Sequence, residues 1–141
     1  MNNIKISKNF NLTEYQCKCG CNQVIINSKH ALNNQAFRDF LNKDKAEGEK
    51  ETVLVSNSSY RCETNNVKSG GAKNSQHRLG NADDWIAYNS GMTVMELYEK
   101  ALEFGKYKGV IAYPNRGIVH CDSRQGEVHR KIDYSRGVKG T

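Results

Sequence analysis

The pattern of hydrophobic and polar residues in the first half of the chain predicts one amphipathic helix and one strand. Residues 28–42 favour a helix that begins at Ser28, because serine is a common N-cap. Residues 52–56 are rich in β-branched side chains, which is typical of a strand. The apolar positions that recur at helical spacing and define the buried face of the helix are Leu32, Ala36, Phe37, Phe40 and Leu41.

The second half predicts a strand, a helix and a hairpin. A strand is predicted over residues 82–88. Thr93 and Glu96 form a capping box that opens a second helix, and Gly105 ends it. Two further strands, 109–113 and 118–122, are joined by a turn that contains the single proline. Together the elements predict an α+β domain with a small, mostly antiparallel sheet and flanking helices.

Two stretches lack a clear pattern. Residues 1–27 are irregular, with a single helical turn expected near residues 11–14. Residues 57–81 are polar and rich in glycine, and we expect a long loop there. Because long loops in compact domains are usually functional, this stretch is where candidate chemistry is expected.

Composition narrows the class of protein. A chain of 141 residues with 37% hydrophobic residues fits a single domain, with a core over about residues 9–124 and a tail after about residue 134. It has neither an 18-residue apolar run nor a signal peptide, so we expect synthesis in a host cytoplasm without a transmembrane segment and action elsewhere only after release. A net charge of +6 suits an anionic wall polymer, whereas the scattered basic residues do not favour nucleic acid. A monomer is expected.

The candidate chemistry begins with His77 and Asp84, which lie seven residues apart across Gly80. A second histidine, His120, follows on a predicted strand, two residues before Asp122. Two imidazoles and one carboxylate are a donor set of catalytic zinc sites that leave a position open for water. The period of two in a strand gives His120 and Asp122 the same face.

At this point the sequence resembles the M15 family of zinc peptidases, which cut cell-wall peptides, and in particular its D-alanyl-D-alanine carboxypeptidase-like branch and phage or bacterial wall hydrolases. The pattern S-x-H-x-x-G-x-A-x-D from Ser75 to Asp84, followed by H-x-D, carries the resemblance. Four other segments also resemble parts of the family. Phe10 to Gly20 is similar to its N-terminal opening, and Val55 to Cys62 is similar to its strand that ends in an arginine. Gly70 to His77 is similar to the segment before its first ligand, and Tyr113 to His120 is similar to its final hairpin.

The resemblance implies roles for particular residues and a hedgehog/DD-peptidase-like fold. His77, Asp84 and His120 match the zinc ligands. Arg61 matches an arginine that binds a peptide carboxylate, and Ser75 and Gln76 would line the substrate cleft.

The general base is left open. Some branches of the family carry a glutamate three residues before the last ligand, where this chain has Gly117. Asp122 is the preferred catalytic base or partner of His120. The alternative register makes Asp122 the third ligand and His120 the base, and His129 is a third candidate base. Asp83, beside Asp84, is expected to be solvated or to lie behind the ligands.

The cysteine count is odd, with five thiols. Cys17, Cys19 and Cys21 alternate, and the favoured interpretation is that of partly buried thiols, because three thiols without a fourth partner make an incomplete metal site. Cys121 and Trp85 are expected in the core.

The sequence therefore predicts a Zn²⁺-dependent metallopeptidase that hydrolyses an amide bond in peptidoglycan stem peptides, as a carboxypeptidase or endopeptidase and as a phage or prophage endolysin. The alternative is a catalytically silent zinc-binding structural or binding module of a phage particle.

Overall fold

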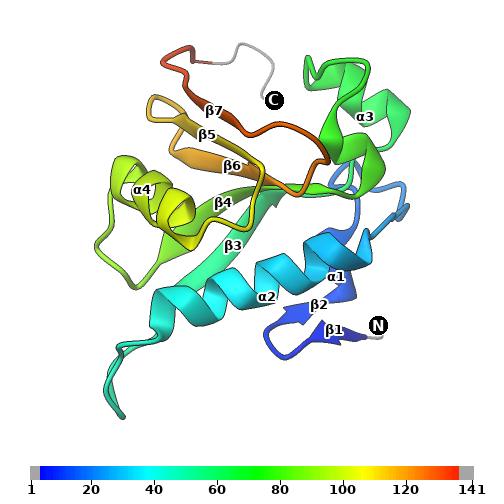
Figure 1. The fold of residues 1–141 in the computed structure, drawn as a ribbon. Helices are drawn as coiled ribbons and strands as arrows, with labels where there is room; N and C mark the ends of the chain where they lie inside the picture. Colours follow the sequence, from blue (N-terminus) through cyan, green and yellow to red (C-terminus); the bar gives the residue numbers. More distant parts are fainter. Residues whose placement is uncertain (1–3, 137–141) are drawn as a thin grey trace.

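The computed structural model describes residues 4–136, which form a mixed sheet of five strands with helices on one face and a small hairpin beside it (Figure 1). The sheet order is β3-β4-β6-β5-β7, and only the β5–β7 pair is parallel. The α+β prediction with a mostly antiparallel sheet is confirmed. The strands of the hairpin and the main sheet are β1 (Lys5–Ser7), β2 (Phe10–Asn11), β3 (Val53–Ser58), β4 (Ala82–Tyr88), β5 (Gly109–Tyr113), β6 (Ile118–Asp122) and β7 (His129–Ile132).

The two long helices of the described chain agree closely with the predicted ranges. They are α2 (Ser28–Asn42) and α4 (Val94–Phe104), whose capping box at Thr93 and left-handed Gly105 are as expected. The short helices are α1 (Leu12–Tyr15) and α3 (Glu63–Lys68), with a 3₁₀ helix at Gln76–Leu79. None of the described helices is long and apolar enough to cross a membrane.

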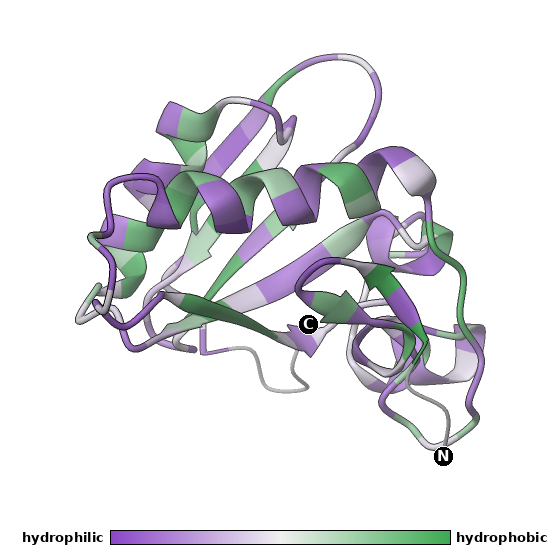
Figure 2. Cartoon of the chain, turned by 90° about the horizontal axis from the view of Figure 1, so that it is seen from below, coloured by the Kyte–Doolittle hydropathy of each residue, from purple (hydrophilic) through white to green (hydrophobic). Residues whose placement is uncertain are grey.

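The sheet has one covered face and one face that carries the polar site. Phe37 of α2 and Phe104 of α4 pack against each other with ring centroids 5.1 Å apart. On the covered face, Trp85 contacts Phe10 and is buried, and Cys121 is also fully buried, as expected. Figure 2 shows hydrophilic and hydrophobic residues side by side on the long helix α2, as expected for a helix that covers a core.

Some sequence predictions are wrong. The N-cap of α2 is Asn27, whose side chain accepts a hydrogen bond from the His30 amide, and Ser28 is the first helical residue. Leu32 is 71% exposed, because it lies two residues from both His30 and Asn34, which are fully buried, and therefore on the opposite side of the helix. The loop over residues 57–81 contains α3 and the 3₁₀ helix.

Candidate metal centre

His77 is held rigidly at the start of the polar site. The hydroxyl of Ser75 accepts a hydrogen bond from the His77 amide at 3.2 Å, which caps the 3₁₀ helix. Gly80 then turns the chain into β4 with a φ of +66°, a conformation that favours glycine. The buried ring of His77 donates from Nδ1 to the Ser59 carbonyl oxygen at 2.7 Å. This bond leaves the lone pair on Nε2, which faces Asp84.

Asp84 and His120 are direct neighbours across the β4–β6 pair. The Oδ1 atom of Asp84 lies 3.3 Å from His77 Nε2 and 3.1 Å from His120 Nδ1. All three side chains are buried, and one ligand atom from each lies within 4.8 Å of the others. The structure therefore brings together the two histidines and the aspartate that the sequence singled out.

The hydrogen positions in this cluster favour a cation. His120 Nε2 donates to Asp122 Oδ2 at 2.8 Å, so a neutral His120 directs the lone pair of Nδ1 at Asp84. The buried Nε2 atom of His77 has no hydrogen-bond partner. When His120 is neutral, three electron-pair donors therefore converge on one point, and this arrangement would suit a divalent cation between them.

Asp122 lies behind His120. It contacts the ring nitrogen that faces away from Asp84 and also accepts hydrogen bonds from Arg124 Nε at 2.8 Å and Nη2 at 2.6 Å. Burial opposes ionisation of this carboxyl, but Arg124 and His120 outweigh it and hold the pKa of Asp122 below its usual range. An added Cβ at Gly109 would collide with the Asp122 carboxylate, so this glycine makes room for it.

The charge of the three-residue cluster is set by close contacts. Burial raises the pKa of Asp84, but the attraction of the His77 and His120 imidazoles holds that pKa well below its usual range. Burial lowers the pKa of His120, and its hydrogen bonds to Asp122 and Asp84 outweigh this and raise the pKa to about 9. Asp84 is therefore ionised at neutral pH, and a metal ion bound at His120 Nδ1 would have to displace a proton from it.

The metal-free protein is expected to lose stability at alkaline pH through His120. The pKa of His120 is about 9 in the folded state and about 6.5 in the unfolded state. The protonated ring therefore adds to the free energy of unfolding. This contribution is complete below about pH 6.5 and is lost as the pH rises through about 9. The stability advantage of the wild type over His120→Gln should shrink by a few kcal/mol across this window. Urea unfolding in the presence of a chelator measures it, and an advantage that does not change with pH would contradict the ion-pair geometry.

Arg61 follows β3 and lies against the cluster. Its Nη2 atom is 3.4 Å from Asp84 Oδ2, its Nε donates to Ser58 Oγ at 2.9 Å, and its Nη1 contacts Asn66 Oδ1 at 3.4 Å. The side chain is almost completely buried. These contacts fix the guanidinium at the wall of the site.

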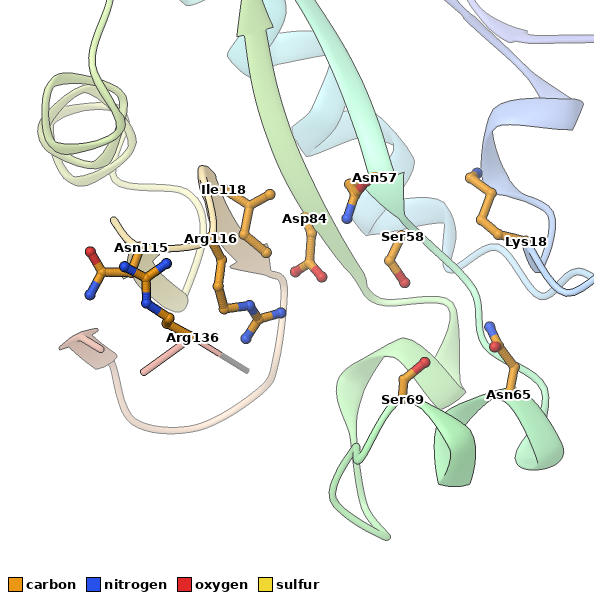
Figure 3. Close-up of a pocket in the computed structure, with 10 residues that line it drawn as sticks. All are labelled: Lys18, Asn57, Ser58, Asn65, Ser69, Asp84, Asn115, Arg116, Ile118 and Arg136. Carbon is orange, nitrogen blue, oxygen red and sulfur yellow. The ribbon is translucent and has the colours of Figure 1, made fainter. Parts of the chain in front are cut away.

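Two clefts border the cluster. One, of about 350 Å³, is lined by Arg61, His77 and His120 and also by Ser75 and Gln76. The other, of about 580 Å³, has Asp84 in its wall, and Figure 3 shows the Asp84 carboxylate between Ser58 on one side and Arg116 on the other. Three cationic side chains line this second cleft: Lys18, Arg116 and Arg136.

Two other candidates lie elsewhere. His129 is exposed on β7 and lines neither cleft. Asp83 was expected to be solvated or near the ligands, but it points to the covered face and is buried. It is hydrogen-bonded there to His30 Nε2 at 2.8 Å, Asn34 Nδ2 at 2.8 Å and Ser56 Oγ at 2.6 Å. This network, which joins α2 to the sheet, could not be inferred from spacing because its members are far apart in the chain.

The sequence of the chain matches the family Peptidase M15 over residues 8–122. The match includes both halves of the cluster, from His77 to Asp122, together with Arg61. Among curated proteins no sequence is similar enough to count as a match. The chain therefore belongs to the M15 family and is a peptidase by that membership.

Proposed function

We propose that the protein is a zinc-dependent peptidase that hydrolyses an amide bond in the stem peptides of peptidoglycan. The single observation that carries the proposal is the convergence of His77 Nε2, Asp84 Oδ1 and His120 Nδ1, with the buried His77 nitrogen unpartnered. Two imidazoles and one carboxylate are a donor set of catalytic zinc. M15 peptidases are zinc-dependent, which supports the choice of metal.

The residues around the ligands would divide the work of catalysis. When bound, zinc supplies a Lewis acid for the scissile carbonyl and lowers the pKa of a bound water. Arg61 has a planar fork of donors suited to a substrate carboxylate, and its contact with Asp84 holds it beside the ligands. Ser75 and Gln76 would contact the peptide along the smaller cleft.

We propose that Asp122 acts by positioning His120. Its carboxylate accepts a hydrogen bond from Nε2 of the ring, whereas Nδ1 faces Asp84, so His120 is favoured as the third ligand over Asp122. A carboxylate behind a ligating histidine fixes its tautomer and raises its basicity. The bond to Arg124 keeps Asp122 ionised for this purpose.

Replacing Asp122 with asparagine is expected to weaken zinc binding about 10- to 100-fold. The amide keeps the shape of the carboxylate and loses the charge that polarises His120. The measurement is the free zinc concentration that restores half of the peptidase activity of chelator-treated protein. Asp39→Asn, on the exposed face of α2, is the matched control and should not move that concentration. An equal value for Asp122→Asn and wild type would argue against the positioning role.

The charge of the clefts supports a peptide substrate with free carboxylates. Lys18, Arg116 and Arg136 line the larger cleft, and Arg61 and Arg124 line the smaller one. Stem peptides carry such carboxylates. The net charge of +6 would also keep the protein on an anionic wall.

The proposed activity is tested with purified peptidoglycan. Zinc-loaded protein is expected to release new amino groups, a chelator should stop the release, and added zinc should restore it. Free D-alanine as the product would identify a carboxypeptidase, and conversion of cross-linked dimers to monomers would identify an endopeptidase. Intact peptidoglycan in the presence of zinc-loaded, folded protein would refute the peptidase proposal for this substrate.

One observation favours the alternative of a catalytically silent zinc-binding module. Among the described residues that line the two clefts, Asp84 is the one carboxylate, and Asp122 lies behind His120. A peptidase usually places a general base within reach of the attacking water. Bound zinc without release of amines from peptidoglycan would support this alternative.

The proposed endolysin role requires that the protein reaches the cell wall, and this is tested separately. The test compares a susceptible bacterium that expresses this chain with and without a membrane-permeabilising holin, which opens the way to the wall. Co-expression with a membrane-permeabilising holin should cause lysis. If the culture does not lyse even with the holin, the endolysin role is contradicted. The peptidoglycan assay then decides separately whether the protein hydrolyses the wall.

A further inference from the structure

The structure brings four of the five cysteines into one cluster, which corrects the sequence-based interpretation of three thiols without a partner. Cys17, Cys19 and Cys21 follow α1, and Cys62 lies just before α3. Cys62 is 45 residues from Cys17 in the chain, and their sulfur atoms are 3.7 Å apart. The fourth partner is therefore supplied by a distant segment, in the position next to Arg61.

The spacing of the sulfur atoms is that of a tetrahedral metal site. The distances are 3.4 Å from Cys17 to Cys19 and 3.6 Å from Cys19 to Cys62, and all four sulfur atoms lie within 4.8 Å of one another. Four thiolates around zinc, with bonds of about 2.3 Å, place their sulfurs about 3.8 Å apart. A disulfide would join only two of them and would not require four thiols to meet at one point.

Backbone amides around the cluster point at its sulfur atoms. The amide of Cys62 donates to Cys17 Sγ at 3.5 Å, that of Asn65 to Cys62 Sγ at 3.4 Å, and that of Gln23 to Cys21 Sγ at 3.4 Å. Donors directed at sulfur favour thiolates, the form that binds metal, and hold them in place. Three of the four cysteines thus have this support.

We propose that Cys17, Cys19, Cys21 and Cys62 bind a structural zinc ion, separate from the metal centre at His77, Asp84 and His120. Four thiolates leave no open position for water or substrate, so this ion is structural. Its role is to fasten the segment after α1 to the start of α3, beside the Tyr60–Tyr15 backbone hydrogen bond of 3.2 Å. The ion would thereby hold Arg61 at the wall of the peptidase site.

The test uses the full chain purified under reducing conditions and analysed for metals. Wild type should contain two zinc ions per chain, and His77→Ala and Cys62→Ser should each contain one. Because Cys62 is buried and its replacement could prevent folding, Cys21→Ser at the exposed position is the second variant. Cys121→Ala removes a buried thiol outside the cluster and should keep both ions.

Cobalt replacement separates this site from the peptidase site. Cobalt bound by thiolates gives intense sulfur-to-metal charge-transfer absorption, which a site of two histidines and one aspartate cannot give. The absorption should be present in wild type, His77→Ala and Cys121→Ala, absent in Cys62→Ser and reduced in Cys21→Ser. Since activity is not the readout, the result stands whether or not the peptidase proposal is correct.

Three outcomes would overturn the proposal. The first is wild-type protein without the charge-transfer band and with the four thiols of the cluster open to a thiol reagent in the folded state. The second is a disulfide within the cluster in protein purified under reducing conditions. The third is iron in the cluster in place of zinc after expression with both metals available, since four thiolates also suit iron.

Discussion

Replacing His77 with alanine is expected to abolish zinc binding at the proposed peptidase site. It should also lower the proposed activity on peptidoglycan by about 10³-fold or more, since a bound metal supplies several kcal/mol of transition-state stabilisation. His77 contributes the one buried nitrogen of the cluster without a hydrogen-bond partner, so its loss leaves Asp84 and His120 as an incomplete donor set. The measurements are the zinc content of the purified variant and its rate of amine release.

The matched control for this prediction is His129→Ala. His129 is exposed on β7 and lines neither cleft, so the variant should keep its zinc and full activity. The same variant tests whether His129 is the general base. A loss of activity in His129→Ala as large as that in His77→Ala, with zinc retained, would contradict this arrangement of the site.

Gly80→Ala is expected to lower the free energy of unfolding by roughly 2–5 kcal/mol. Two costs add at this position. The φ of +66° is strained for any residue with a Cβ, and the new Cβ would collide with the Ile25 backbone carbonyl, which cannot move as a flexible side chain does. Because Gly80 joins His77 to the strand of Asp84, the shift should also weaken metal binding. Urea unfolding of the variant measures the first effect.

Gly91→Ala separates the two costs. Gly91 has a φ of +67°, almost the same as Gly80, but a Cβ there meets nothing within 4 Å. It should lose only about 1–2 kcal/mol, the cost of the left-handed conformation. If both variants lost the same stability, the close approach of residues 25 and 80 would be refuted.

The periodic elements could be predicted from the sequence because their signals are local. The capping box at Thr93 and the left-handed Gly105 bound α4 as expected, and the ranges of β5 and β6 are also confirmed. Two of the elements that were not predicted, α3 and β7, carry no such signal. In α3 only Asn66 is buried, and all four residues of β7 are exposed, so neither segment has a hydrophobic period.

The candidate site was predictable in part for the same reason. His77 and Asp84 are close in the sequence, because only the turn at the end of the 3₁₀ helix and the first residues of β4 separate them. His120 and Asp122 lie on the same face of β6, because side chains alternate along a strand. The contact of Cys62 with Cys17 depends on how two loops fold back across 45 residues, which no local pattern encodes. The same holds for the Ser59 carbonyl that orients His77.

The most direct test of the account is mass spectrometry of defined stem-peptide fragments of peptidoglycan after incubation with zinc-loaded protein. The wild type is expected to yield products that each correspond to hydrolysis of a single amide bond, and His77→Ala is expected to leave the same fragments intact. Identical products from both proteins, or none from wild type with zinc bound at its peptidase site, would contradict the assignment of a zinc peptidase to His77, Asp84 and His120.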